Sequence, residues 1–61
     1  MTTFKILVLE QSGNENELCQ VGSNPAAVVQ AALRKTIAVQ VGRRWKRVPM
    51  YRGARFVEVE E

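Results

Sequence analysis

The feature that most constrains this chain is a basic segment at residues 41–56, with the sequence VGRRWKRVPMYRGARF. It holds six basic and three aromatic side chains and no acidic one. The whole chain has only 61 residues, and a domain of that size hides only about 60% of the surface of its unfolded chain. So many charged residues cannot be buried, and the rest of the chain must supply a thin core.

Charge on both sides of this segment limits how it can fold. In an extended conformation, Arg43, Trp45 and Arg47 share one face of the strand. Arg44 and Lys46 then lie on the other face. Because a core strand cannot bury unpaired charges on both faces, we expect this part of the chain to project from the body as a loop or a basic hairpin arm, at about residues 42–53.

Composition excludes several classes of function. The chain has no His and no Asp, and Cys19 is its single cysteine. It therefore has too few ligands for a zinc site and cannot form an internal disulfide. It also lacks a glycine-rich phosphate loop and a nucleophile motif. We expect that the protein is not an enzyme, with no catalytic residue, no metal and no cofactor.

The sequence also carries signals of location. It contains no apolar run long enough to span a membrane and no signal-peptide pattern at its N-terminus. A lone cysteine is typical of proteins from a reducing compartment. We therefore expect a cytoplasmic protein that does not interact with membranes.

The first third of the chain predicts a β-hairpin. Residues 3–11 are rich in strand formers and carry apolar side chains on both faces, which is typical of a central strand. Residues 12–16 have the composition of a turn. Residues 17–21 alternate again, and we expect them to return as an antiparallel neighbour of the first strand.

A helix of about twelve residues is predicted within residues 22–36, GSNPAAVVQAALRKT. A polar capping residue followed by Pro25 suits the start of a helix. Val29, Ala32 and Leu33 form one apolar stripe at helical spacing. A helix this short needs tertiary packing to be stable, so we expect the stripe to lie against the sheet.

The second half of the chain predicts further strands. Residues 36–42 alternate with a period of two, and Gly42 opens a turn. Pro49 argues against a central strand position and for an edge or a bulge. We expect a short strand at residues 48–51, a tight turn at residues 52–53 and a final strand at residues 54–60.

Together these elements predict one small α+β domain over residues 1–61, in which one α-helix packs on an antiparallel β-sheet in the order β-β-α-β-β-β. The side chains expected to be most buried are apolar residues of the strands and the helix: Ile6, Val8, Val29, Leu33, Val39 and Val57.

The distribution of charge points to binding. Residues 34–57 hold eight cations and no acid, whereas residues 1–33 carry a net charge of −2. Nucleic-acid binding requires cations that neutralise phosphates and, for single strands, flat side chains on which bases stack. The residues predicted to contact nucleic acid are the cations and the tryptophan of the basic segment: Arg43, Arg44, Trp45, Lys46, Arg47 and Arg52.

Two functions fit these features. The first is a small basic binding module that contacts RNA or DNA with little sequence preference. The alternative is an accessory or regulatory protein-interaction domain, a homodimer or a subunit that docks on an acidic protein partner. A third interpretation gives the basic hairpin no direct role in binding, and Trp45 then closes the end of the core. The apolar strand at residues 4–9 also predicts a homodimer that buries part of the Leu7 and Leu9 face.

Overall fold

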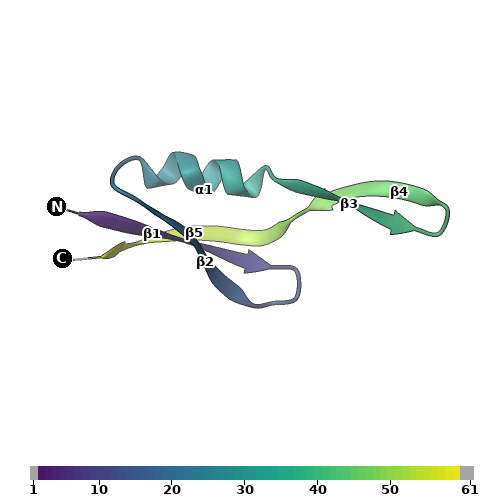
Figure 1. The fold of residues 1–61 in the computed structure, drawn as a ribbon, viewed down its shortest axis with the longest axis horizontal. Coiled ribbons are helices and arrows are strands. Elements are labelled where there is room, and N and C mark those ends of the chain that lie inside the picture. The colour runs from purple at the N-terminus through teal and green to yellow at the C-terminus, as the bar shows by residue number, and fades with distance from the viewer. Residues whose placement is uncertain (1, 60–61) are drawn as a thin grey trace.

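Five strands and one helix form the described part of the protein, in the predicted order β-β-α-β-β-β (Figure 1). A computed structural model describes residues 2–59, and residues 1, 60 and 61 lie outside it. The elements are β1 (Thr3–Glu10), β2 (Glu15–Val21), α1 (Pro25–Leu33), β3 (Thr36–Val41), β4 (Arg44–Pro49) and β5 (Tyr51–Val59). The predicted α+β class is confirmed.

The body of the protein is built on a three-stranded antiparallel sheet in the order β2-β1-β5. The two-sided apolar strand β1 is central, as its sequence predicts. Gly13 takes φ 96° in the turn between β1 and β2, where a residue with a Cβ would be strained. Leu18 is an extra residue in β2, because Ile6 pairs with Cys19 while Leu7 pairs with Glu17.

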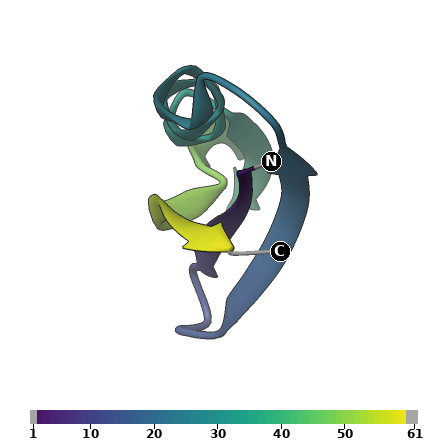
Figure 2. The same cartoon turned by 90° about the vertical axis from the view of Figure 1, so that its left-hand side faces the viewer.

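The helix α1 covers one face of this sheet and lies over β1 and β5 (Figure 2). Pro25 occupies its first turn, as predicted. The residues that α1 turns away from water are spaced three and four apart: Pro25, Val28, Val29 and Ala32. Opposite them in β1, Ile6 and Val8 are buried.

The predicted core is partly wrong. Among the described residues, the buried apolar side chains are Ile6, Val8 and Ala32, at 0%, 3% and 1% exposure. Leu33 is 42% exposed, because it follows Ala32 by 100° around the helix and leaves the stripe. The valines at positions 29, 39 and 57 are half-buried.

The strands β3 and β4 form a separate two-stranded sheet, so the expected single sheet is replaced by two. Their register joins Thr36 to Pro49 at one end and Val41 to Arg44 at the other. Gly42 takes φ 64° in the two-residue turn between them, a backbone conformation that hairpin turns of this length commonly assign to glycine. Pro49 is the last residue of β4, where its missing N–H does not interrupt the ladder of hydrogen bonds.

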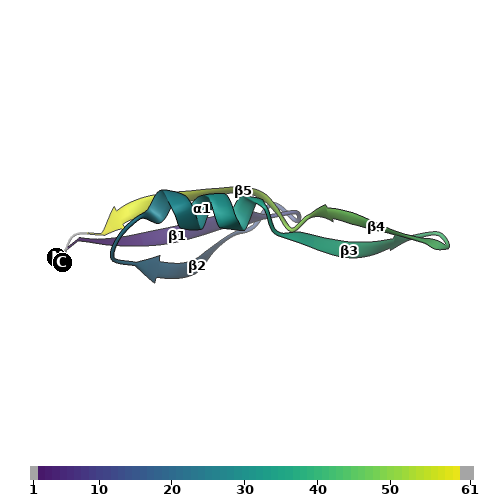
Figure 3. The same ribbon diagram turned by 90° about the horizontal axis from the view of Figure 1, so that it is seen from above.

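This hairpin extends the long axis of the molecule beyond the body (Figure 3). The principal extents of the protein are 51 × 20 × 12 Å and its radius of gyration is 14.0 Å. A compact domain of this length has a radius of gyration of about 10.5 Å. The protein is therefore elongated.

The prediction of a tight turn at residues 52–53 is wrong. Tyr51–Val59 is one continuous strand that pairs with β1, and it does not fold back on β4. Leu9 pairs with Gly53 and Glu10 pairs with Tyr51, so Arg52 is the extra residue of a β-bulge. Gly53 therefore lies beside a bulge within a strand. Bulges, like turns, are common positions for glycine in β-structure. Of the predicted final strand, residue 60 lies outside the described residues.

Candidate nucleic-acid interface

The candidate interface is the β3–β4 hairpin, which we call the arm and define as residues 36–49. One hydrogen bond closes the base of the arm, and a second ties it to the body. The Met50 N–H donates to the carbonyl oxygen of Lys35 over 2.9 Å. The Gln11 side-chain amide donates to the carbonyl oxygen of Pro49, also over 2.9 Å. The base of the arm is therefore held by the turn after β1 and by the residue that precedes β3.

One side of the arm presents an aromatic ring beside a cation. Directly paired residues of an antiparallel hairpin share a face, and Trp45 pairs with Gln40 while Arg47 pairs with Ala38. The Arg47 Nε–H donates a hydrogen bond to Oγ1 of Thr36 over 3.1 Å, which orients the guanidinium along this face. We call this side the tryptophan face; it consists of Thr36, Ala38, Gln40, Trp45, Arg47 and Pro49.

Trp45 does not close the core. Its side chain is 69% exposed, the highest value among the large apolar residues that the structure leaves open to water. The arm carries it away from the body, and the helix α1 and strand β1 form the core without it. This finding excludes the interpretation of Trp45 as a lid and leaves its ring available to a ligand.

The other side of the arm is apolar with two cations. Ile37 pairs with Val48, Val39 with Lys46, and Val41 with Arg44. We call this side the valine face; it consists of Ile37, Val39, Val41, Arg44, Lys46 and Val48. The sequence-based division of the basic segment into two faces is thus confirmed for positions 44–47.

The structure brings five of the six predicted contact residues together. Arg43 lies in the turn at the tip of the arm, and Arg44, Trp45, Lys46 and Arg47 follow it in β4. The sixth, Arg52, belongs to the body. Its guanidinium lies near Gly13 of the β1–β2 turn. The expected arm at residues 42–53 is therefore replaced by one at residues 36–49.

The pairing of β3 with β4 also brings two polar side chains to the tryptophan face, which the sequence pattern did not indicate. Gln40 lies directly opposite Trp45, and Thr36 accepts the hydrogen bond from Arg47. Both belong to β3, whose alternating pattern was interpreted only as a strand. The place of Gln40 beside Trp45 and of Thr36 beside Arg47 depends on the pairing of β3 with β4, which single-residue patterns do not encode.

Among the described residues, the cations of the arm have no acidic partner. Arg43, Arg44, Lys46 and Arg47 are all exposed. Within residues 2–59, none of them lies within ion-pair distance of a carboxylate. Their positive charges therefore add to one another at the tip, and such a cluster attracts anions from solution.

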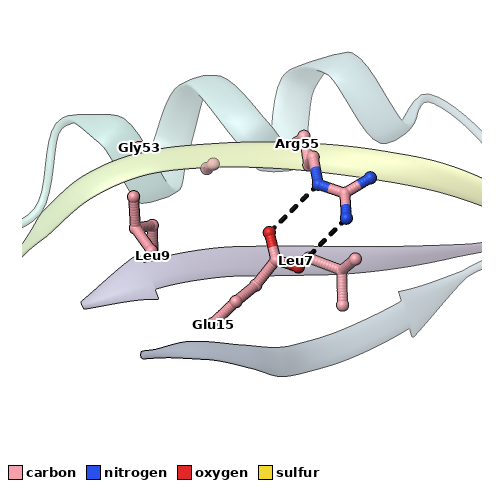
Figure 4. A pocket seen from close by; sticks show the side chains of 6 residues that line it. Leu7, Leu9, Glu15, Gly53 and Arg55 are labelled. Atoms are coloured by element: carbon pink, nitrogen blue, oxygen red, sulfur yellow. Dashed lines mark hydrogen bonds and ion pairs between the residues drawn. The ribbon is translucent and has the colours of Figure 1, made fainter. Parts of the chain in front are cut away.

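The ion pairs that the structure does contain lie on the body, on the sheet face opposite α1 (Figure 4). Arg55 of β5 reaches across β1 and donates two hydrogen bonds of 3.0 Å to the carboxylate of Glu15 in β2. Beside this pair is a shallow hollow of about 150 Å³. The residues that line it are Leu7, Leu9, Glu15, Gly53, Ala54 and Arg55.

The Glu15–Arg55 pair shifts the titration of both groups. The hydrogen bonds from Arg55, together with its positive charge, hold the pKa of the Glu15 carboxyl below its ordinary value, against a smaller opposing effect of desolvation. The hydrogen bonds to Glu15 raise the pKa of Arg55 above its ordinary value. Both groups stay charged at neutral pH, and the pair spans all three strands of the sheet.

Neither a metal centre nor a membrane-spanning helix is found in residues 2–59. No three His, Cys, Asp or Glu side chains in this range are grouped so that they could hold a metal ion. The helix α1, with nine residues, is too short to cross a bilayer. Comparisons of the chain with known protein families, with curated proteins and with solved structures found no match.

Proposed function

We propose that this protein is a small binding module that contacts RNA or DNA through the arm, with little sequence preference. The observation that carries the proposal is the exposed Trp45 on a projecting, acid-free hairpin, next to Arg47 and close to Arg43. Single-stranded nucleic acids are bound by this combination of stacking platforms and cations.

The chemistry of each part fits this role. The ring of Trp45 offers a flat apolar surface to a base, and stacking of that kind contributes about 1–3 kcal/mol per base. The guanidinium of Arg47 is held along the same face by Thr36, and an arginine fork suits bidentate contact with phosphate oxygens. Contacts to phosphate position a ligand but do not read its sequence, which supports weak sequence preference.

Other features of the molecule support the expected homodimer and the expected location in the cytoplasm. The elongated shape and the uncovered apolar side chains of the valine face favour a homodimer. The lone, half-buried Cys19 favours a reducing compartment, and we place the protein in the cytoplasm. We assign it no catalytic activity and no cofactor.

A salt titration of binding tests the proposed function. We expect the affinity for a short single-stranded oligonucleotide to fall with salt, with a slope of log K against log[salt] set by the phosphates that the arm neutralises. Replacing Arg43 and Arg47 together by glutamine should flatten this slope by about two units. Stability should hardly change, because exposed charges contribute little folding energy.

The matched control is the double variant Arg34→Gln with Lys35→Gln, which removes two exposed cations from the end of α1 and leaves the arm intact. It should keep the slope of the unmodified protein. Equal effects of the two double variants would mean that net charge, and not the arm, drives binding. Tight binding of polyglutamate with no binding of oligonucleotide would instead favour an acidic protein partner.

A further inference from the structure

The valine face of the arm is uncovered in the single chain. Val41 is 60% exposed and Ile37 is 39% exposed, while Val39 and Val48 are half-buried. An isolated two-stranded hairpin is marginally stable in water and is usually supported by packing against another element. Within residues 2–59, no other helix or strand makes an extensive contact with β3 or β4, which leaves this face open to a partner.

The accessible surface of the molecule indicates how much area a partner would cover. The chain exposes 4742 Å², whereas a compact protein of its mass, 6.9 kDa, exposes about 4000 Å². The excess is about 700 Å², which is close to the 800 Å² or so that each partner buries in an interface of standard size. One interface of that size would bring the exposed surface to that of a compact fold.

The chain itself contains a surface that complements the valine face. On the sheet face opposite α1, Leu7 and Leu9 of β1 are half-buried and border the shallow hollow (Figure 4). Glu17 and Glu15 of β2 pair directly with these leucines and so share their face. This body face thus joins apolar side chains to two carboxylates, each paired with a cation of the same face, Glu15 with Arg55 and Glu17 with Lys5.

One of these carboxylates can accept a further cation. Glu15 is held by two hydrogen bonds from Arg55. Glu17 has Lys5 at 3.9 Å, the outer limit of an ion pair, and accepts one hydrogen bond of 3.2 Å from Gln20. The lysine and arginine of the valine face, Lys46 and Arg44, have no carboxylate partner among the described residues.

We infer that the valine face of the arm is a docking surface for a second copy of this chain, and that it packs on the body face carrying Leu7 and Leu9. An arm strand of six residues spans about 20 Å and the seven residues of β2 about 23 Å, so arm and body match in length. Two copies that lie side by side and antiparallel place each arm on the other body. The contact is then reciprocal and closed by a two-fold axis.

This inference specifies the homodimer of the proposed function but does not depend on nucleic-acid binding. The dimer uses the valine face and therefore takes Arg44 and Lys46 from the predicted nucleic-acid contacts. Nucleic acid is then assigned to the tryptophan face on the other side of the arm and to Arg43 at the tip. A variant that breaks the dimer can therefore retain oligonucleotide binding, and the two proposals fail separately.

Sedimentation equilibrium of a matched pair of variants tests the dimer. Val41→Glu places a carboxylate at the most exposed apolar position of the valine face, near the tip of the arm, and should raise the dimer dissociation constant at least about tenfold. Gln40→Glu adds the same charge at the neighbouring position on the tryptophan face and should leave the dissociation constant within about twofold. Both substitutions lie in the arm, and circular dichroism should show an unchanged body in each.

Methyl contacts between isotopically labelled and unlabelled copies identify the surface independently of any variant. Intermolecular NOEs from the Ile37 and Val41 methyl groups to those of Leu7 and Leu9 are the expected result. A protein that remains monomeric at millimolar concentration would overturn the inference. So would a dimer whose NOEs join arm to arm or helix to helix, or one that Val41→Glu and Gln40→Glu weaken equally.

Discussion

At the scale of single residues, the contact with the clearest physical signature is the Glu15–Arg55 pair. Its two hydrogen bonds join β2 to β5 across the central strand. It lies over Leu7 and Leu9, side chains that a three-stranded sheet with a single helix leaves only half-buried. The pair therefore connects the strands from which the body is built.

The Glu15–Arg55 pair should make the free energy of unfolding depend on pH in the acid range. Because the pKa of Glu15 is lower in the folded protein than in the unfolded chain, its contribution to stability is fully present above the ordinary carboxyl pKa. It is lost as the pH falls through the lowered value. Urea unfolding followed by circular dichroism between about pH 2 and pH 5 measures this effect. As the pH falls, the unmodified protein should lose stability more steeply than the variant Glu15→Gln.

The control is Glu58→Gln, which removes an exposed carboxylate that has no ion-pair partner within residues 2–59. This variant should keep the pH dependence of the unmodified protein. If Glu15→Gln and Glu58→Gln have the same acid profile as the unmodified chain, the Glu15–Arg55 pair is not maintained in solution.

The sequence could identify the candidate contact residues but not their surroundings. Charge on both faces at positions 43–47 was enough to predict a projecting element. Whether Trp45 belonged to the core could not be decided, because a tryptophan flanked by arginines is typical of both a core rim and a binding surface. Gln40 became part of the candidate site only through its pairing with Trp45, a contact between strands that no local pattern reveals.

At the scale of elements, the helix shows how a correct period can still give a wrong core residue. The pattern predicted a helix and its start at Pro25. Two adjacent positions, Ala32 and Leu33, fitted the stripe almost equally well, and hydrophobicity favoured the leucine. The structure buries the smaller residue, since the stripe that meets the sheet runs through Val28, Val29 and Ala32.

Substitutions at the core and at Leu33 should differ accordingly. Ile6→Ala removes a side chain with 0% exposure and should lower the free energy of unfolding by about 2–5 kcal/mol. Leu33→Ala should lower it by about 1 kcal/mol or less, because Leu33 is 42% exposed and a helix accepts alanine well. Urea denaturation followed by circular dichroism measures both, and a loss at Leu33 as large as that at Ile6 would contradict the observed stripe.

The strands after the helix were the hardest to predict. Gly53 after a charged residue resembles a turn, and local pairing of two strands is the simplest interpretation of such a glycine. Instead β5 pairs with β1, more than forty residues earlier in the sequence. The alternation of β5 fits either partner, so only the long-range packing of α1 and the sheet selects between them.

At the scale of the whole molecule, the protein divides into a thin body and a two-faced arm. The body closes its core with one helix and three strands, and the arm lengthens the molecule to 51 Å. Composition predicted the thin core and the exposed charge. The separation of the two sheets was not predicted, because hairpins inside and outside a body share the same alternating pattern.

This shape gives the arm two separate uses in our account. We propose that the valine face meets a second copy of the chain and that the tryptophan face meets nucleic acid. The tip with Arg43 extends the positive charge of both faces beyond the body. A long, acid-free element of this kind favours fast, salt-dependent association with a polyanion.

The most direct test of this account is the intrinsic fluorescence of the protein during titration with a short single-stranded oligonucleotide at about 50 mM salt. The chain has one tryptophan and one tyrosine, so excitation at the red edge of the absorption band, where tyrosine does not absorb, makes the signal report on Trp45 alone. We predict saturable quenching that high salt reverses, and a loss of affinity of about 1–3 kcal/mol for Trp45→Ala in a label-based assay. An unquenched Trp45 with no measurable binding at that salt concentration would contradict the assignment of the arm to nucleic acid.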